Sequence, residues 1–122
     1  MPAAPHILIS EDYAAVRDLL TTIVARMYPT GTITAVATST QALAVYDQHG
    51  ADIVITNVKQ PIFRGLALIQ TLRDQQPTLP ILAISMDASI AELALAAGAT
   101  RFLQKPFILN EVRQVLSELL PP

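Results

Sequence analysis

Short apolar runs alternate with longer amphipathic stretches along this chain, and the alternation occurs five times within 122 residues. The short runs are rich in β-branched and aliphatic residues, whereas apolar residues recur at helical spacing in the longer stretches. Strands that alternate with helices predict a parallel sheet, and right-handed crossovers place helices on both of its faces. The sequence therefore predicts an α/β, doubly wound (βα)5 three-layer sandwich, formed by a single domain over residues 1–122.

The predicted elements follow one another without an internal repeat, a linker or a low-complexity segment. Strands are expected at residues 6–10, 32–38, 52–56, 79–84 and 100–103, and helices at residues 12–27, 39–48, 65–76, 88–97 and 107–120. Ser39 or Thr40 is expected to cap the second helix. Gly65 is expected to open the third helix, after a loop that carries Pro61.

The composition excludes several classes of protein. Hydrophobic residues make up 52% of the chain, enough to bury a core, so disorder is not expected. A net charge of −2 without runs of like charge argues against binding to nucleic acid or to an anionic membrane. The absence of cysteine excludes disulfides and thiolate metal sites. No signal peptide or membrane-spanning run is recognisable, so a cytoplasmic location is expected.

Chemically active side chains follow the predicted strands. Ligands of doubly wound sheets bind outside the carboxyl ends of the strands. At these places the sequence has the acidic pair Glu11 and Asp12, the amide Asn57, the hydroxyl Ser85 and the ammonium Lys105. Each of them alone has an ordinary explanation as a helix cap, a turn residue or a solvated charge. Together, paired acids for a divalent cation, a hydroxyl and a lysine can handle a phosphoryl group without a Gly-rich loop.

These residues lie in motifs that resemble the receiver domain of two-component response regulators, over essentially the whole chain. The motifs are ILIS before Glu11-Asp12, DIVIT before Asn57 with Pro61 and Gly65 behind it, PILAI before Ser85, and FLQ before Lys105-Pro106-Phe107. The resemblance implies a flavodoxin-like fold whose five parallel strands have the order 2-1-3-4-5. It also implies a signal-transduction module of a phosphorelay rather than an enzyme, with no catalytic residue.

By this resemblance, Glu11 and Asp12 match the acidic pair that binds Mg²⁺, and Lys59 matches the position whose backbone carbonyl completes the metal site. Asn57 stands at the phosphoacceptor position, where the family has aspartate. An amide oxygen is a far weaker nucleophile than a carboxylate, so phosphorylation at this position is not expected. The loss of one carboxylate also predicts weakened Mg²⁺ binding.

The resemblance assigns three further residues to phosphoryl contact and switching. Ser85 matches the hydroxyl that moves onto the phosphoryl group, Lys105 the lysine that contacts its oxygens, and Phe102 the aromatic switch residue. Without an anionic partner at Asn57, Lys105 is expected to turn to one of the two acidic residues. Tyr13, which follows the acidic pair, is expected to cover part of the pocket.

The sequence thus predicts a pseudo-receiver that acts through protein–protein contacts, with a sensor histidine kinase or another two-component signalling protein as partner. Helix 88–97, strand 100–103 and helix 107–120 are the expected surface for a homodimer or an effector. Helix 88–97 is apolar nearly all round, which suggests a covering partner. Alanines are also simply good helix formers, so this pattern has a second explanation.

The sequence is compatible with two alternatives. Asn57 could be an introduced substitution in an ordinary, Mg²⁺-dependent phosphoacceptor receiver. A small flavin- or nucleotide-binding protein shares this fold class, but the acidic loop SEDYA after the first strand lacks the cradle that a cofactor phosphate needs. His6 and His49 are expected far from the polar cluster, so neither is assigned a catalytic role.

Overall fold

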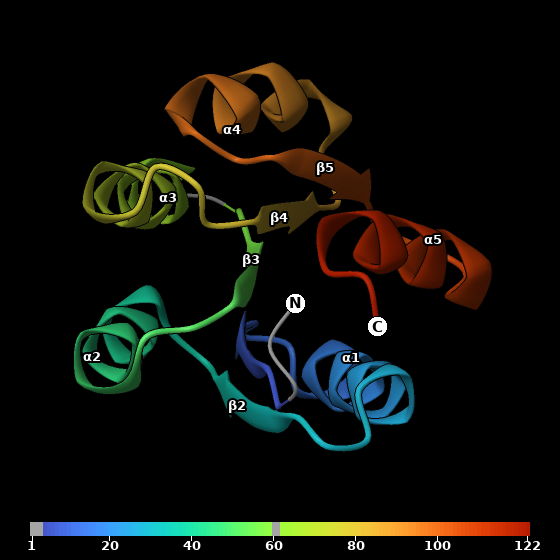
Figure 1. Ribbon diagram of the computed structural model, residues 1–122. Coiled ribbons are helices and arrows are strands. Elements are labelled where there is room, and N and C mark those ends of the chain that lie inside the picture. Colours follow the sequence, from blue (N-terminus) through green and yellow to red (C-terminus); the bar gives the residue numbers. More distant parts are fainter. Residues whose placement is uncertain (1–3, 60–61) are drawn as a thin grey trace.

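The computed structural model describes residues 4–59 and 62–122, and strands alternate with helices throughout (Figure 1). Pro61, which the sequence placed in a loop, lies outside the described residues. The strands are β1 (His6–Ser10), β2 (Thr32–Val36), β3 (Ile53–Asn57), β4 (Ile81–Ser85) and β5 (Arg101–Gln104). The helices are α1 (Ala14–Met27), α2 (Ser39–His49), α3 (Ile62–Gln75), the 3₁₀ turn η1 (Ala88–Ile90), α4 (Ala91–Ala97) and α5 (Leu109–Leu119).

All strand pairs in the sheet are parallel, and the strand order is β2-β1-β3-β4-β5. Helices α1 and α5 cover one face, whereas α2, α3 and α4 cover the other (Figure 1). The predicted three-layer (βα)5 fold and its strand order are therefore confirmed. Among the described residues, no helix is both long and apolar enough to cross a membrane.

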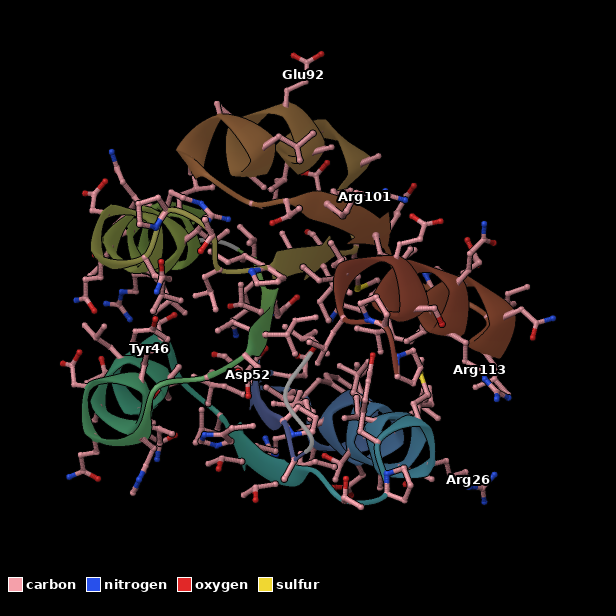
Figure 2. All side chains as sticks on the ribbon, viewed as in Figure 1. Arg26, Tyr46, Asp52, Glu92, Arg101 and Arg113 are labelled. Atoms are coloured by element: carbon pink, nitrogen blue, oxygen red, sulfur yellow. The ribbon has the colours of Figure 1, made fainter. Side chains whose placement is uncertain are left out.

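Two apolar cores lie on the two faces of the sheet because successive strand residues point to opposite sides. In β1, Ile7 and Ile9 pack with α1 and α5, whereas Leu8 packs with α2, α3 and α4. The central strands β1, β3 and β4 are covered on both faces, which explains why they are apolar at most positions. Charged side chains such as Arg26, Glu92 and Arg113 point away from the body of the protein (Figure 2).

Several predicted boundaries were wrong by one to three residues, as is usual for element ends. The third helix begins at Ile62 and not at Gly65, and Asn57 is the last residue of β3 rather than part of a loop. The segments predicted as helix 88–97, strand 100–103 and helix 107–120 are η1 with α4, β5 at 101–104, and α5 at 109–119.

The cap of α2 is Thr38, not Ser39 or Thr40. Its side-chain oxygen accepts a hydrogen bond from the Gln41 backbone N–H, and the Gln41 side chain accepts from the Thr38 backbone N–H. This is a capping box, in which a hydroxyl and a glutamine three residues later satisfy one another's backbone donors. Three hydroxyl residues follow one another here, so composition alone did not single out the cap.

Gly98 ends α4 with a φ of +125°, a conformation that residues with a side chain rarely adopt. A Cβ at this position would lie 2.8 Å from Cβ and Cγ of Arg73. The close approach lets Arg73 Nε donate a hydrogen bond of 2.9 Å to the Gly98 carbonyl. Gly98 thereby fixes the end of α4 against α3.

Tyr28 connects the end of α1 to the end of α5. Its side chain is only 3% exposed, and its hydroxyl donates to the Leu120 carbonyl at 2.6 Å, with the Leu116 carbonyl at 3.2 Å. A buried carbonyl that loses its donor keeps the cost of having left water. The hydroxyl therefore stabilises the α1–α5 layer in addition to the packing of the ring.

We predict that Tyr28→Phe lowers the free energy of unfolding by about 1 kcal/mol, because it removes this hydrogen bond while keeping the ring. Urea unfolding followed by circular dichroism measures the change. Tyr13→Phe is the matched control, since Tyr13 is 65% exposed, and its effect is expected to stay below about 0.5 kcal/mol. Equal losses in the two variants would contradict the structural role of the Tyr28 hydroxyl.

Burial raises the pKa of Tyr28 to about 12, from an ordinary value of 10.0. A group whose pKa is higher in the folded state contributes stability below its unfolded pKa, and this contribution disappears as the pH rises through the folded pKa. We therefore expect the free energy of unfolding to fall as the pH rises from 10.0 toward about 12. Urea unfolding across this range should give a flatter profile for Tyr28→Phe than for the wild-type protein.

Candidate functional site

The strand register brings the polar residues to one edge of the sheet. Ser10 pairs with Thr56, Asn57 with Ile84, and Ser85 with Gln104, so the carboxyl ends of β1, β3, β4 and β5 are adjacent. The loops that follow β1 and β5 then place Glu11, Asp12 and Lys105 at the same edge. The sequence predicted this gathering because the strands were expected to be parallel.

Glu11 and Lys105 form a buried ion pair beneath this edge. Their side chains are 0% and 12% exposed, and Lys105 Nζ lies 2.9 Å from Glu11 Oε1. The other carboxylate oxygen, Oε2, accepts a hydrogen bond of 3.0 Å from the backbone N–H of Tyr13. The expectation that Lys105 turns to the acidic pair is confirmed, and its partner is Glu11.

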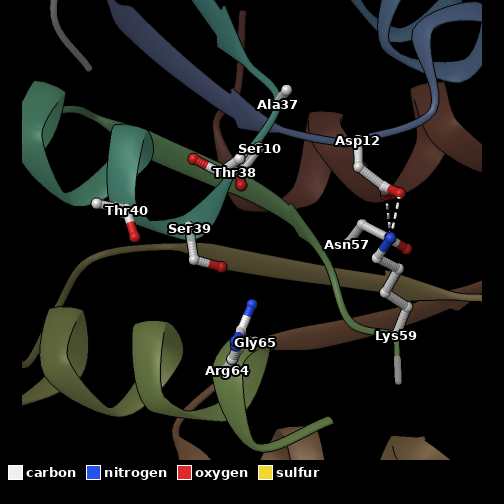
Figure 3. Close-up of a pocket in the computed structure, with 10 residues that line it drawn as sticks. All are labelled: Ser10, Asp12, Ala37, Thr38, Ser39, Thr40, Asn57, Lys59, Arg64 and Gly65. Atoms are coloured by element: carbon white, nitrogen blue, oxygen red, sulfur yellow. Dashed lines mark hydrogen bonds and ion pairs between the residues drawn. The ribbon is translucent and has the colours of Figure 1, made fainter. Parts of the chain in front are cut away.

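Asp12 has two partners from β3 and the residues behind it (Figure 3). Its Oδ1 accepts a hydrogen bond of 2.9 Å from Asn57 Nδ2, and its Oδ2 lies 2.5 Å from Lys59 Nζ. Partial burial raises the pKa of Asp12, but the hydrogen bonds, led by that from Lys59, outweigh it and bring the pKa below the ordinary value. Asp12 is therefore a carboxylate at neutral pH.

Ser85 is 2% exposed at the end of β4, and its hydroxyl oxygen accepts a hydrogen bond of 3.1 Å from the Asp87 backbone N–H. Asp87 in turn caps η1 by accepting from the Ser89 backbone N–H. Hydrogen bonds from Ser89 lower the pKa of the Asp87 carboxyl. Ser85 thus lies at the turn, while Asp87 serves as the helix cap.

A pocket of about 260 Å³ opens above these residues, lined by Asp12, Tyr13, Asn57, Lys59, Ser85, Met86, Asp87, Ile90 and Lys105. Five of the predicted site residues are therefore together. Glu11 is connected to the pocket through Lys105, whereas Phe102 is half-buried against the core on the α3–α4 side. Met86, 75% exposed, and Asp87 also line the pocket, although sequence reasoning gave them no place in it.

Both side chains of the acidic pair accept hydrogen bonds from donors of the protein itself. Each of the four carboxylate oxygens of Glu11 and Asp12 accepts a hydrogen bond, from Lys105, Tyr13, Asn57 and Lys59. In the described part of the chain, no three His, Cys, Asp or Glu side chains are grouped so that they could hold a metal ion. His6 is at the opposite end of β1, where its ring contacts that of His49.

Comparison with known proteins agrees with this architecture. The response regulator receiver domain matches residues 7–117. The chain is 35% identical over 120 residues to the DNA-binding transcriptional regulator NtrC of Azospirillum brasilense, covering 97% of this chain and 24% of that protein. It is 30% identical over 113 residues to the transcriptional regulatory protein CitT of Bacillus subtilis, covering 91% of this chain and 50% of that protein.

A solved structure of a putative response regulator from Chloroflexus aurantiacus superposes with a TM-score of 0.85 at 25% identity, covering 98% of this chain and 99% of that one. The chain belongs to the response regulator receiver domain family of two-component signalling systems. It spans about a quarter to a half of the length of the two curated relatives named above. Receiver domains typically bind Mg²⁺ at the edge of the sheet described here.

We predict that Lys105→Met lowers the free energy of unfolding by about 3 kcal/mol, because it leaves the buried Glu11 carboxylate without its cation. Lys59→Met is the matched control. The Lys59–Asp12 pair is exposed, with side chains 62% and 36% accessible, so its loss is expected to cost about 0.5 kcal/mol or less. Urea unfolding measures both, and a Lys59→Met variant as unstable as Lys105→Met would contradict the assignment of the buried pair.

Proposed function

We propose that this chain is a receiver module that transmits signals through protein contacts and does not accept a phosphoryl group at the end of β3. The observation that carries the proposal is the side chain of Asn57, which is an amide and donates a hydrogen bond to Asp12. We infer that Asn57, the last residue of β3, stands at the phosphoacceptor position of the family. An acyl phosphate requires a carboxylate oxygen as the nucleophile.

In this proposal the other site residues still lie where residues that handle a phosphoryl group would be expected. Ser85 and Lys105 would contact the phosphoryl oxygens, and the ring of Phe102 on β5 would rotate when these contacts form. In this chain Lys105 is held by Glu11 at 2.9 Å, and the Ser85 hydroxyl accepts from Asp87. These contacts favour one fixed arrangement of the edge, because the groups that would respond to phosphate already have partners.

We further infer that this edge binds Mg²⁺ only weakly. Glu11, Asp12 and the backbone carbonyl of Lys59 are the groups that would form the metal site. As arranged, they do not fit a resident ion, because a lysine occupies each carboxylate and Asn57 presents its NH₂ group to Asp12. Magnesium would have to displace an ammonium from at least one carboxylate, a cost absent where the acids are free.

The surface formed by α4, β5 and α5 is the contact region that we propose for a second copy or for an effector. Leu93 and Leu95 lie on the two flanks of the buried Ala94 in α4 and are 47% and 46% exposed, and Leu109 at the start of α5 is 49% exposed. An exposed ion pair between Arg101 and Glu118, with 2.6 Å between nitrogen and oxygen, lies between β5 and α5. Exposed apolar side chains with charged residues at the rim are typical of protein interfaces.

The test is intact-mass analysis after incubation with acetyl phosphate and Mg²⁺. We predict that the wild-type protein gains no phosphoryl group, because an amide cannot replace the carboxylate nucleophile. A wild-type protein that becomes phosphorylated on Asn57, or on another residue of the pocket, would overturn the proposal.

Asn57→Asp is the matched variant, because it restores the carboxylate while changing only one group. Phosphorylation of this variant alone would show that Ser85, Lys105 and the acidic pair are competent and that Asn57 by itself prevents the reaction. If neither protein is phosphorylated, the pocket differs from a reactive one by more than the one substitution. The first outcome would favour a recent loss or an introduced substitution in an otherwise ordinary receiver, and the second would favour a fixed conformation.

A further inference from the structure

A second hollow lies on the other side of Asp12 and Asn57, away from Ser85 and Lys105. Its volume is about 300 Å³ (Figure 3). Its walls are the ends of β1 and β3, the start of α2 and the first turn of α3, and its lining residues are Ser10, Asp12, Ala37, Thr38, Ser39, Thr40, Asn57, Lys59, Arg64 and Gly65. We call this hollow the α2–α3 cleft. The function proposed above gives no role to most of the residues that line this cleft.

Hydrogen-bond donors gather at the start of α2. The first N–H groups of a helix have no acceptor within the helix. The capping box of Thr38 and Gln41 occupies the N–H groups of Ala37, Thr38 and Gln41. Among the described residues, no acceptor is found for the backbone N–H groups of Ser39 and Thr40. The side-chain hydroxyls of the same two residues are further donors at this place. The helix is 11 residues long, so its N-terminus carries the usual partial positive charge.

The side chain of Ser10, at the end of β1, faces the same cleft from the sheet. Along β1 the side chains alternate, and Ser10 follows Leu8 on the face covered by α2 and α3. It is 5% exposed and lines the cleft, yet its hydroxyl has no hydrogen-bond partner in the part of the chain that the structure describes. The hydroxyl oxygen itself is accessible from the cleft, because no fully buried side-chain nitrogen or oxygen of the described residues lacks a partner. Its available partner is therefore water or a polar ligand in the cleft.

The charge balance of the cleft favours an anion. Arg64 extends from the first turn of α3 toward Ser39 (Figure 3), and no carboxylate pairs with it among residues 4–59 and 62–122. Lys59 and Asp12 also line the cleft, but they neutralise one another across 2.5 Å. The guanidinium of Arg64 is therefore the uncompensated charge. A planar guanidinium with several donors suits phosphate oxygens.

We propose that the α2–α3 cleft binds the phosphate group of a small phosphate monoester. The Arg64 guanidinium and the N–H groups of Ser39 and Thr40 are placed to donate to its oxygens, together with the hydroxyls of Ser10, Ser39 and Thr40. A phosphate presents three acceptor oxygens, and this donor set is larger than a carboxylate can use. The binding requires no chemistry at Asn57, so it is independent of the function proposed above.

The test is a ¹H–¹⁵N NMR titration of the full chain with inorganic phosphate and with ribose 5-phosphate. The ionic strength is kept constant with chloride, at a pH high enough for both inorganic phosphate and the monoester to be dianions. We expect saturable shifts of the Ser39 and Thr40 amides. Arg64→Gln should weaken binding by about tenfold or more, because it removes the uncompensated charge.

Arg26→Gln is the matched control, because it removes the same charge from an exposed residue at the far end of α1, and its affinity should stay within about twofold. Tighter binding of ribose 5-phosphate than of inorganic phosphate identifies an organic monoester as the ligand, and equal affinities identify the phosphate group alone as what is recognised.

Two results would overturn the proposal. Shifts that do not saturate, or that are the same in Arg64→Gln and in the wild-type protein, would show that the cleft does not select phosphate. Shifts confined to the Ser85, Met86 and Lys105 amides would place the anion in the other pocket. Neither result bears on whether Asn57 can be phosphorylated, so failure here is distinguishable from failure of the proposed function.

Discussion

The ion pair between Glu11 and Lys105 is the interaction on which the polar edge of this domain depends. It joins the end of β1 to the residues after β5, and both side chains are largely removed from water. A buried charge is costly unless it is paired, so each of these residues requires the other. Their pairing links the loop after β5 to the end of β1, in addition to the backbone ladder that joins β5 to β4.

The pairing of Glu11 with Lys105 also affects Asp12, the carboxylate that lies closer to solvent. Because Lys105 is held by Glu11, Asp12 takes its donors from Asn57 and Lys59. These three residues form a wall between two hollows, one with Ser85 and Lys105 and the other with Ser10 and Arg64. The polar edge therefore has two separate hollows, and the amide of Asn57 lies between them.

The order of strands and helices was predictable because it rests on local periodicity, and the central strands β1, β3 and β4 are largely apolar runs buried on both faces. The start of α3 was not predictable from Gly65. A Cβ at Gly65 would lie 3.2 Å from Val58 Cγ1, so glycine is needed within the first turn for close packing against the end of β3 and not as a helix start. Thr38 was missed as a cap because its neighbours are also hydroxyl residues, and only the backbone conformation distinguishes them.

The sequence by itself determined the alternation of strands and helices, and with it the edge at which Glu11, Asp12, Asn57, Ser85 and Lys105 meet. It also determined that the group at the end of β3 is an amide, since this is a matter of covalent chemistry. Only the tertiary structure decided which lysine pairs with which acid, and that Ser10 and Arg64 share a cleft. These contacts join residues tens of positions apart, and packing across the sheet brings them together where local preference cannot.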